Sequence, residues 1–323
     1  MIVTVTMNPA IDKTVLVPGF RVGATNRATV HGITVGGKGI NVARTLRRLG
    51  CEVLATGFLA NDEGSGVAAT LAQQGIPADF IQVHGETRVN LKVIDTLAAT
   101  ETEINEPGFA VPAAAIRALD DKLEALAARA EVMIFSGSLP PGAPADLYAR
   151  FIGLAKRAGV RTVLDTAGVA LGHGIGAQPD LVKPNRAEAE ELLDAGLLDE
   201  RDLLSAARRL MDLGASSVVL SLGTDGALSA SPAGIWRSRL PDLPARSTVG
   251  AGDAMVAALT YGLLRGLPPD EALHLATAAG CAAATGAGPA PLLDEIAALL
   301  PQVTVTAVPL SIAATGVVPN APS

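Results

Sequence analysis

Short apolar segments alternate with longer amphipathic ones along most of this chain. Apolar runs with the length of buried strands lie at 1–7, 52–58, 131–135, 160–164, 179–183 and 216–221. Apolar residues recur with helical spacing at 40–49, 112–130, 145–158, 186–195, 202–213, 250–265, 270–284 and 291–300. Strand–helix–strand alternation builds a parallel sheet that is covered by helices. The sequence therefore predicts an α/β fold with a doubly wound, mostly parallel sheet and helices on both faces.

Composition supports this architecture and narrows the partners. Only 3% of the residues are aromatic although 49% are hydrophobic, so the core must be aliphatic, as in buried parallel sheets. The net charge of −7 repels nucleic acid and anionic membranes, and we expect neither as a partner. An anionic ligand would therefore need a local cluster of positive charge.

Cysteine usage and the apolar segments indicate a cytoplasmic protein. Cys51 and Cys281 lie far apart and outside any metal-binding spacing, so we expect reduced, partly buried thiols. The segment MIVTVTM lacks the features of a signal peptide. Gly, Pro or charged residues interrupt every apolar stretch before the ~18 residues that a membrane span needs.

Two segments interrupt the alternation. Residues 11–35 are β-rich without a helix, and 87–105 have the pattern of a hairpin. Within this hairpin Arg88, Asn90 and Lys92 alternate with apolar residues and so share one face. A charged face on an edge strand is commonly only a solvated surface. We expect a small β-layer that stands away from the main sheet, either a lid or a dimerisation surface.

Polar residues follow the predicted strands at five places. In open α/β sheets, ligands bind beyond the carboxyl ends of the strands. Each place alone has the composition of an ordinary turn, but together the five outline one edge of the sheet. They are residues 8–12, 136–140, 165, 183–185 and 223–226.

The segment STVGAGDAMVA places glycines directly before an apolar helix. Free amides at a helix N-terminus bind anions. Asp253 lies in the first turn of this helix, where an acidic residue is commonly only a cap. Beside a bound phosphate, the same carboxylate could instead accept the proton of an attacking hydroxyl while the amides stabilise the transferring phosphoryl group.

The segment GITVGGKGIN at 32–41 nearly matches a nucleotide P-loop, but Gly39 stands where that loop needs a Ser or Thr for magnesium. GGKGINVAR and STVGAGDAMVA together resemble the paired signatures of the ribokinase-like (PfkB) family of carbohydrate kinases. In that family the GGKGxN segment holds the sugar. The resemblance implies one kinase domain at 1–307 with a β lid from about 11–35 and 87–105, and ATP and Mg²⁺ as cofactors. Residues 308–323 show no periodic pattern, so we expect a loose tail there.

The resemblance also implies roles for individual residues. Catalysis falls to Asp253 as general base, with the amides of Gly250, Ala251 and Gly252 as an anion hole. The phosphosugar is assigned to Asp12, Arg27, Gly36, Gly37, Lys38, Asn41, Arg88, Asn90 and Ser138. The nucleotide is assigned to Lys183, Asn185, Ser221, Gly223 and Gly226. Glu188 and Asp165 are expected to act on magnesium through water. For 276–285, an adenine slot and close helix packing remain alternatives.

Three segments favour one subgroup of the family. TMNPAID, TRVNLKV and TEINEPG resemble 1-phosphofructokinases more than ribokinase or adenosine kinase. This implies transfer from ATP to fructose 1-phosphate, giving fructose 1,6-bisphosphate and ADP. Tagatose-6-phosphate kinase and 6-phosphofructokinase activities remain alternatives, as does a non-catalytic sugar-phosphate sensor. Family analogy also raises the expectation of a homodimer formed through the β lid.

Overall fold

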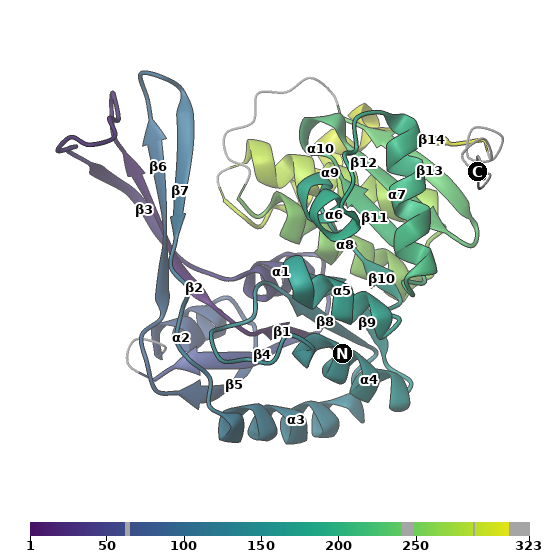
Figure 1. The fold of residues 1–323 in the computed structure, drawn as a ribbon, viewed down its shortest axis with the longest axis horizontal. Helices are drawn as coiled ribbons and strands as arrows, with labels where there is room; N and C mark the ends of the chain where they lie inside the picture. The colour runs from purple at the N-terminus through teal and green to yellow at the C-terminus, as the bar shows by residue number, and fades with distance from the viewer. Residues whose placement is uncertain (62–64, 241–248, 287, 310–323) are drawn as a thin grey trace, which may run out of the picture.

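The structure is a computed structural model that describes residues 1–61, 65–240, 249–286 and 288–309. In these residues the main sheet has ten strands in the order β14-β13-β12-β11-β10-β9-β8-β1-β4-β5 (Figure 1). Their bounds are β1 Ile2–Thr6, β4 Val53–Ala60, β5 Ala78–Val83, β8 Val132–Ser136, β9 Arg161–Asp165, β10 Leu181–Val182, β11 Val218–Ser221, β12 Ala227–Ser231, β13 Gly234–Arg239 and β14 Thr304–Ala307. In this sheet order, all neighbouring strands between β11 and β5 pair parallel. At the other edge, β12, β13 and β14 pair antiparallel with their neighbours.

Helices cover both faces of this sheet, as the alternating pattern predicted. They are α1 Lys38–Arg48, α2 Ser65–Gln73, α3 Ala113–Ala127, α4 Leu147–Arg157, α5 Gly168–Gly176, α6 Arg186–Leu193, α7 Glu200–Asp212, α8 Ala251–Arg265, α9 Pro269–Thr285 and α10 Leu293–Leu299. Helices α3 to α7 pack into one apolar cluster, and α1, α2 and α8 to α10 pack into another. Because side chains alternate along a strand, β1 sends Val3 and Val5 into the first cluster and Ile2 into the second. The predicted doubly wound, mostly parallel sheet is confirmed.

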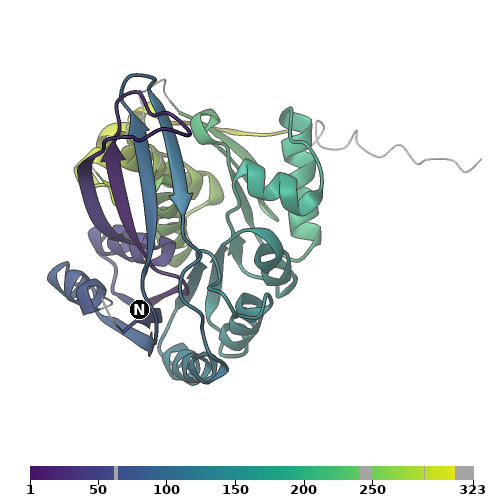
Figure 2. The same cartoon turned by 60° about the vertical axis from the view of Figure 1, so that its left-hand side comes forward.

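A second, four-stranded sheet rises beside this body (Figures 1 and 2). Its order is β3-β2-β6-β7, with bounds β2 Ala10–Leu16, β3 Thr29–Gly36, β6 Arg88–Asp95 and β7 Thr100–Asn105. The central strands β2 and β6 are parallel, and the outer strands pair antiparallel. The register places Asp12 opposite both Thr34 and Asn90. The small β-layer expected from 11–35 and 87–105 is therefore present.

Several smaller expectations can also be compared with the structure. Both cysteines are free thiols, Cys281 being buried and Cys51 partly buried. In the described part of the chain, no helix has the length and apolarity to cross a bilayer. Of the tail predicted at 308–323, Val308 donates its amide to the carbonyl of Ile235 at 2.8 Å. Residues 310–323 lie outside the described residues.

Candidate active site

A cleft of about 1670 Å³ lies between the small sheet and the carboxyl ends of the main-sheet strands. It is lined by residues of both sequence signatures and of all five polar strand ends. Among the predicted site residues, Gly36 and Arg27 do not line it. Gly36 is buried beside the carboxylate of Asp12, and Arg27 is exposed in the connection between β2 and β3. The fold thus gathers residues from Thr6 to Pro289 around one depression.

The N-terminus of α8 faces this cleft. Gly250 precedes the helix with φ 80°, and a Cβ at this position would come within 2.4 Å of Pro289. Only glycine fits such a left-handed, crowded position. The first amides of a helix have no partner within the helix, so those of Ala251 and Gly252 are available to an anion.

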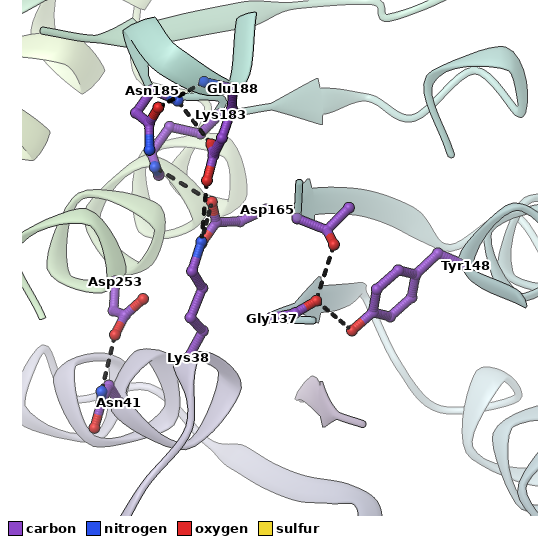
Figure 3. A network of polar contacts seen from close by, with 10 residues as sticks. Lys38, Asn41, Gly137, Tyr148, Asp165, Lys183, Asn185, Glu188 and Asp253 are labelled. Carbon is purple, nitrogen blue, oxygen red and sulfur yellow. Dashed lines mark hydrogen bonds and ion pairs between the residues drawn. The ribbon is translucent and has the colours of Figure 1, made fainter. Parts of the chain in front are cut away.

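Asp253 lies in the first turn of α8 and is only 6% exposed, yet it lines the cleft. Its Oδ2 accepts a hydrogen bond of 2.8 Å from Nδ2 of Asn41 on α1 (Figure 3). Burial and the nearby charge of Asp165 raise the pKa of Asp253 to about 6, although Lys38 and Asn41 oppose the shift. A carboxylate with this pKa is ionised at neutral pH and is a stronger base than an ordinary aspartate.

Asp165, at the end of β9, is the counter-ion of two lysines from opposite sides of the cleft. Its Oδ1 lies 3.4 Å from Nζ of Lys38 and 3.3 Å from Nζ of Lys183 (Figure 3). Burial alone would raise the pKa of Asp165, but the ammonium groups of Lys183 and Lys38 hold it below its usual range. Burial would likewise lower the pKa of Lys38, but Asp165 and Glu188 raise it. The ammonium group of Lys38 therefore stays charged inside the cleft.

Asn185 and Glu188 form a capping box at the start of α6. The Glu188 amide donates to Asn185 Oδ1, and the Asn185 amide donates to Glu188 Oε2, each at 2.8 Å (Figure 3). The other carboxylate oxygen of Glu188 lies 3.7 Å from Nζ of Lys38. This box is common at helix ends, and here it also fixes a carboxylate at the wall of the cleft.

The remaining nucleotide-side positions also line the cleft. Ser221 ends β11, and Gly223 and Gly226 form the turn that follows it. Within 276–285, a Cβ at Gly280 would come within 2.7 Å of Met255, so α9 packs closely on α8. Gly280 lines the cleft as well, as do Ala283 and Ala284. Close helix packing and exposure to the cleft therefore occur in the same segment.

On the small sheet, Asp12 is held in a fixed position. Its Oδ1 accepts a hydrogen bond of 2.8 Å from Asn90, and burial raises its pKa. A Cβ at Gly36 would lie 1.8 Å from Oδ2 of Asp12, so Gly36 makes room for this carboxylate. A Cβ at Gly39 would meet Thr6 Oγ1 at 2.4 Å. The glycine that departs from the P-loop pattern is thus required by packing against β1.

Asn8, which was not singled out as a site residue, links two of the residues that were predicted to bind the phosphosugar. Its carbonyl accepts hydrogen bonds from Nε and Nη2 of Arg88 at 3.3 and 3.2 Å, and its Nδ2 lies 3.3 Å from Ser138 Oγ. The turn before Ser138 is anchored at Gly137, whose carbonyl accepts bonds from Tyr148 and Thr166 (Figure 3). Arg88 and Ser138 therefore converge on one side of the cleft.

Lys92 lies on β6, four residues after Arg88. It lines the cleft, but its Nζ is 2.6 Å from Glu101 and 3.7 Å from Glu103. The acidic strand β7 thus offsets much of its charge. This distribution leaves Arg88 as the better placed of the two cations for an anionic ligand.

A family model described as pfkB family carbohydrate kinase matches residues 5–296. The chain belongs to this family. It is 40% identical over 310 residues to 1-phosphofructokinase of Rhodobacter capsulatus, covering 95% of this chain and 98% of that relative. It superposes on a crystal structure of phosphofructokinase-2 from Escherichia coli in complex with potassium, with a TM-score of 0.86 and 30% identity. That superposition covers 93% of this chain and 98% of the other.

A second solved structure describes the tetrameric inhibited form of the same E. coli enzyme, with a TM-score of 0.85 and 29% identity. The match covers 93% of this chain and 98% of that chain. The resemblance drawn from GGKGINVAR and STVGAGDAMVA is thus confirmed at the level of the pfkB family.

The acidic residues of the cleft do not make a metal site by themselves. In the part of the chain that the structure describes, no group of three or more His, Cys, Asp or Glu side chains is placed to hold a metal ion. One oxygen of Asp165 is shared by two lysines, and Oδ2 is buried without a hydrogen-bond partner among the described residues. Mg²⁺ requires several oxygen ligands and keeps its waters. The described residues therefore do not form a complete ligand set for magnesium, and an ion here would take further ligands from water or from a bound phosphate.

Proposed function

We propose that this chain transfers the terminal phosphoryl group of MgATP to fructose 1-phosphate, giving fructose 1,6-bisphosphate and ADP. The R. capsulatus relative, similar over nearly its whole length, is named for this activity. The cleft contains a buried carboxylate, a helix N-terminus and two lysines, which could serve as the base, the anion site and the cations that phosphoryl transfer needs.

The single observation that supports this function best is Asp253, a buried carboxylate at a helix N-terminus. We assign it the role of general base, accepting the proton of the C6 hydroxyl as the oxygen attacks phosphorus. The amides of Gly250, Ala251 and Gly252 would stabilise the charge on the transferring group. Lys38 and Lys183, held by Asp165, would add positive charge on the opposite side.

The small sheet would supply the binding of the sugar and close over it as a lid. Asp12 would accept hydrogen bonds from sugar hydroxyls, and Asn90 would donate hydrogen bonds to them. The hydrogen bond between these two side chains already holds both in position in the cleft wall. Gly37 and Asn41 would contact the sugar from the start of α1. Arg88 and Ser138, which converge on Asn8, would bind the phosphate already present on the sugar.

The nucleotide would bind at the opposite end of the cleft. Its phosphates would reach Lys183 and Asn185, and the nucleoside would lie over Ser221, Gly223, Gly226 and the small residues of α9. The magnesium ion would arrive with ATP as part of the substrate. Water molecules would connect it to Glu188 and Asp165, since neither carboxylate offers a complete ligand set.

Two other proposals concern assembly and location. Across one row of the small sheet, Ile33, Lys13, Leu91 and Ile104 lie side by side, on the face opposite Asp12. Ile33 is 60% and Ile104 52% exposed, so this face would be covered if two copies paired through it, with Arg27 in the adjoining connection. The use of ATP and the two free thiols support a cytoplasmic location.

The proposed function is tested by the release of ADP in a coupled assay. Fructose 1-phosphate, fructose 6-phosphate, tagatose 6-phosphate and ribose are compared at equal concentrations, and kcat/KM is expected to be highest for fructose 1-phosphate. A preference for fructose 6-phosphate would instead indicate a 6-phosphofructokinase, in line with the name phosphofructokinase-2 of the E. coli structural relative. If none of the four sugars leads to ADP release, the result would favour a non-catalytic sugar-phosphate sensor.

A further inference from the structure

The side chain of Asn41 lies between two charged groups of opposite sign. Its Nδ2 donates to Oδ2 of Asp253 at 2.8 Å, and its Oδ1 accepts from Nη1 of Arg44 at 3.0 Å. Asn41 is only 4% exposed. A guanidinium can only donate hydrogen bonds and a carboxylate can only accept them, so the two neighbours together fix which end of the amide faces which.

Arg44 is itself held in place. It follows Asn41 by three residues on α1, so both side chains lie on one face of the helix. Nη1 of Arg44 also donates to the carbonyl of Val35 on β3 at 2.6 Å, and Nε donates to Gln74 at 2.9 Å. Burial lowers the pKa of Arg44, while the charge of Asp12 opposes this shift. Arginine nevertheless stays protonated in proteins, and the bond to Val35 anchors its guanidinium to the small sheet.

The orientation of the amide matters for the carboxylate. With its N–H toward Asp253, Asn41 stabilises the ionised form of this residue. If the amide turned by half a rotation, its oxygen would face Asp253. This oxygen could then accept a hydrogen bond from Asp253 only if the carboxyl group were protonated. We propose that Arg44 is a positioning residue, which keeps the N–H group of Asn41 directed at Asp253 and so keeps this base ready to accept a proton. This inference rests on the role of Asp253 under the proposed function.

Other charged groups face Asp253 and would stay in place without Arg44. They are Lys38 on α1, Asp165 on β9 and Lys183 after β10. From α9, Cys281 also lines the cleft, but burial raises the pKa of this thiol and keeps it uncharged. The hydrogen bonds of Arg44 go to Val35, Asn41 and Gln74. Its removal therefore acts on the base through Asn41.

The test is the pH dependence of kcat for Arg44→Met at saturating substrates, with Arg47→Met as the matched control. Arg47 lies exposed on the same helix. Loss of one hydrogen bond to the carboxylate is expected to move the acid midpoint up by about one pH unit. At the wild-type midpoint, kcat should then fall about fivefold, whereas two or more pH units above that midpoint it should change by less than about 20%. The control should match the wild type throughout.

A double variant separates this mechanism from a general loss of structure. Asn41→Ala is expected to move the acid midpoint by itself, and adding Arg44→Met should then move it no further, because both changes remove the same interaction. If Arg44→Met does not fold, Arg44→Gln, a neutral helix former with a shorter reach, should show the same direction of shift.

Three results would overturn the inference. One is an unmoved midpoint in a folded Arg44 variant, another is an equal loss of kcat at every pH, and the third is additive shifts in the double variant. An unmoved midpoint with a raised KM for the phosphosugar would assign Arg44 to Asp12 instead. Failure of the proposed function is recognised separately, since the wild-type chain would then release no ADP with fructose 1-phosphate, or Asp253→Asn would keep wild-type turnover.

Discussion

The pKa of Asp253 makes a quantitative prediction for the pH profile of the enzyme. The base must be ionised to accept a proton, so activity should be lost as pH falls through the pKa of about 6. Relative to an ordinary aspartate near 4, this is a shift of about two units, or roughly 2.7 kcal/mol in favour of the protonated form. The main causes of this raised pKa are burial and then the negative charge of Asp165. At pH 5, about one tenth of the molecules would have the ionised base, against about nine tenths with an ordinary aspartate.

The measurement is kcat/KM for fructose 1-phosphate from pH 4.5 to 9 at saturating MgATP, because kcat/KM reports the ionisation of the enzyme without bound sugar. The ratio of kcat/KM at pH 5 to kcat/KM at pH 7.5 should be about 0.1. Because the substrate phosphate also titrates in this range, the profile is repeated with the phosphonate analogue, which titrates at a higher pH. A midpoint that stays near 6 with both substrates belongs to the enzyme. A ratio near 0.9, or a midpoint that follows the substrate, would refute the reasoning.

Three further substitutions test the rest of the cleft. Gly36→Ala should raise the KM for the phosphosugar at least tenfold, because the new Cβ would lie 1.8 Å from Oδ2 of Asp12 and would push this carboxylate out of position. An unchanged KM would contradict the role of Asp12. Arg88→Ala should raise the same KM by about 10–100-fold and leave the KM for ATP unchanged, as expected for one to two charge-assisted hydrogen bonds; equal effects on both would place Arg88 elsewhere. Asp165→Asn should lower the free energy of unfolding by about 3 kcal/mol at neutral pH, the low end for a broken buried ion pair because the Lys38 side chain is 39% exposed. It should also move the acid midpoint of kcat downward, and an upward shift would show that Asp165 does not raise the pKa of Asp253.

The main sheet could be predicted from sequence because most central strands are short, mainly apolar segments such as IVTVT of β1 and VMIFS of β8. The elements that were not anticipated lack such signals. Helix α5 is rich in glycine (GVALGHGIG), and α2 begins with Ser65-Gly66, where helix propensity is low. The hairpin of β12 and β13 carries small and polar residues that tertiary pairing alone makes regular. Local pattern was insufficient for these segments.

For the site, the sequence could indicate which residue types gather at the strand ends but not how they pair. It suggested Lys38 for the sugar and Lys183 for the nucleotide, whereas the structure shows both bound to Asp165. It also gave no sign that Asn41 donates to Asp253, 212 residues away. Arg44 could have been noticed, because a spacing of three on a helix places it beside Asn41. Partners across the cleft depend on the fold and are not visible in local sequence.

Replacement of Asp253 by asparagine tests the central assignment most directly. The amide keeps the shape of the side chain but cannot accept the proton, so kcat for fructose 1-phosphate should fall by about 10²–10⁴. Binding of fructose 1-phosphate, followed by calorimetry, should stay within a few-fold of the wild type, and the melting temperature should not fall, because a buried charge is removed. Turnover by Asp253→Asn at the wild-type rate would contradict the account.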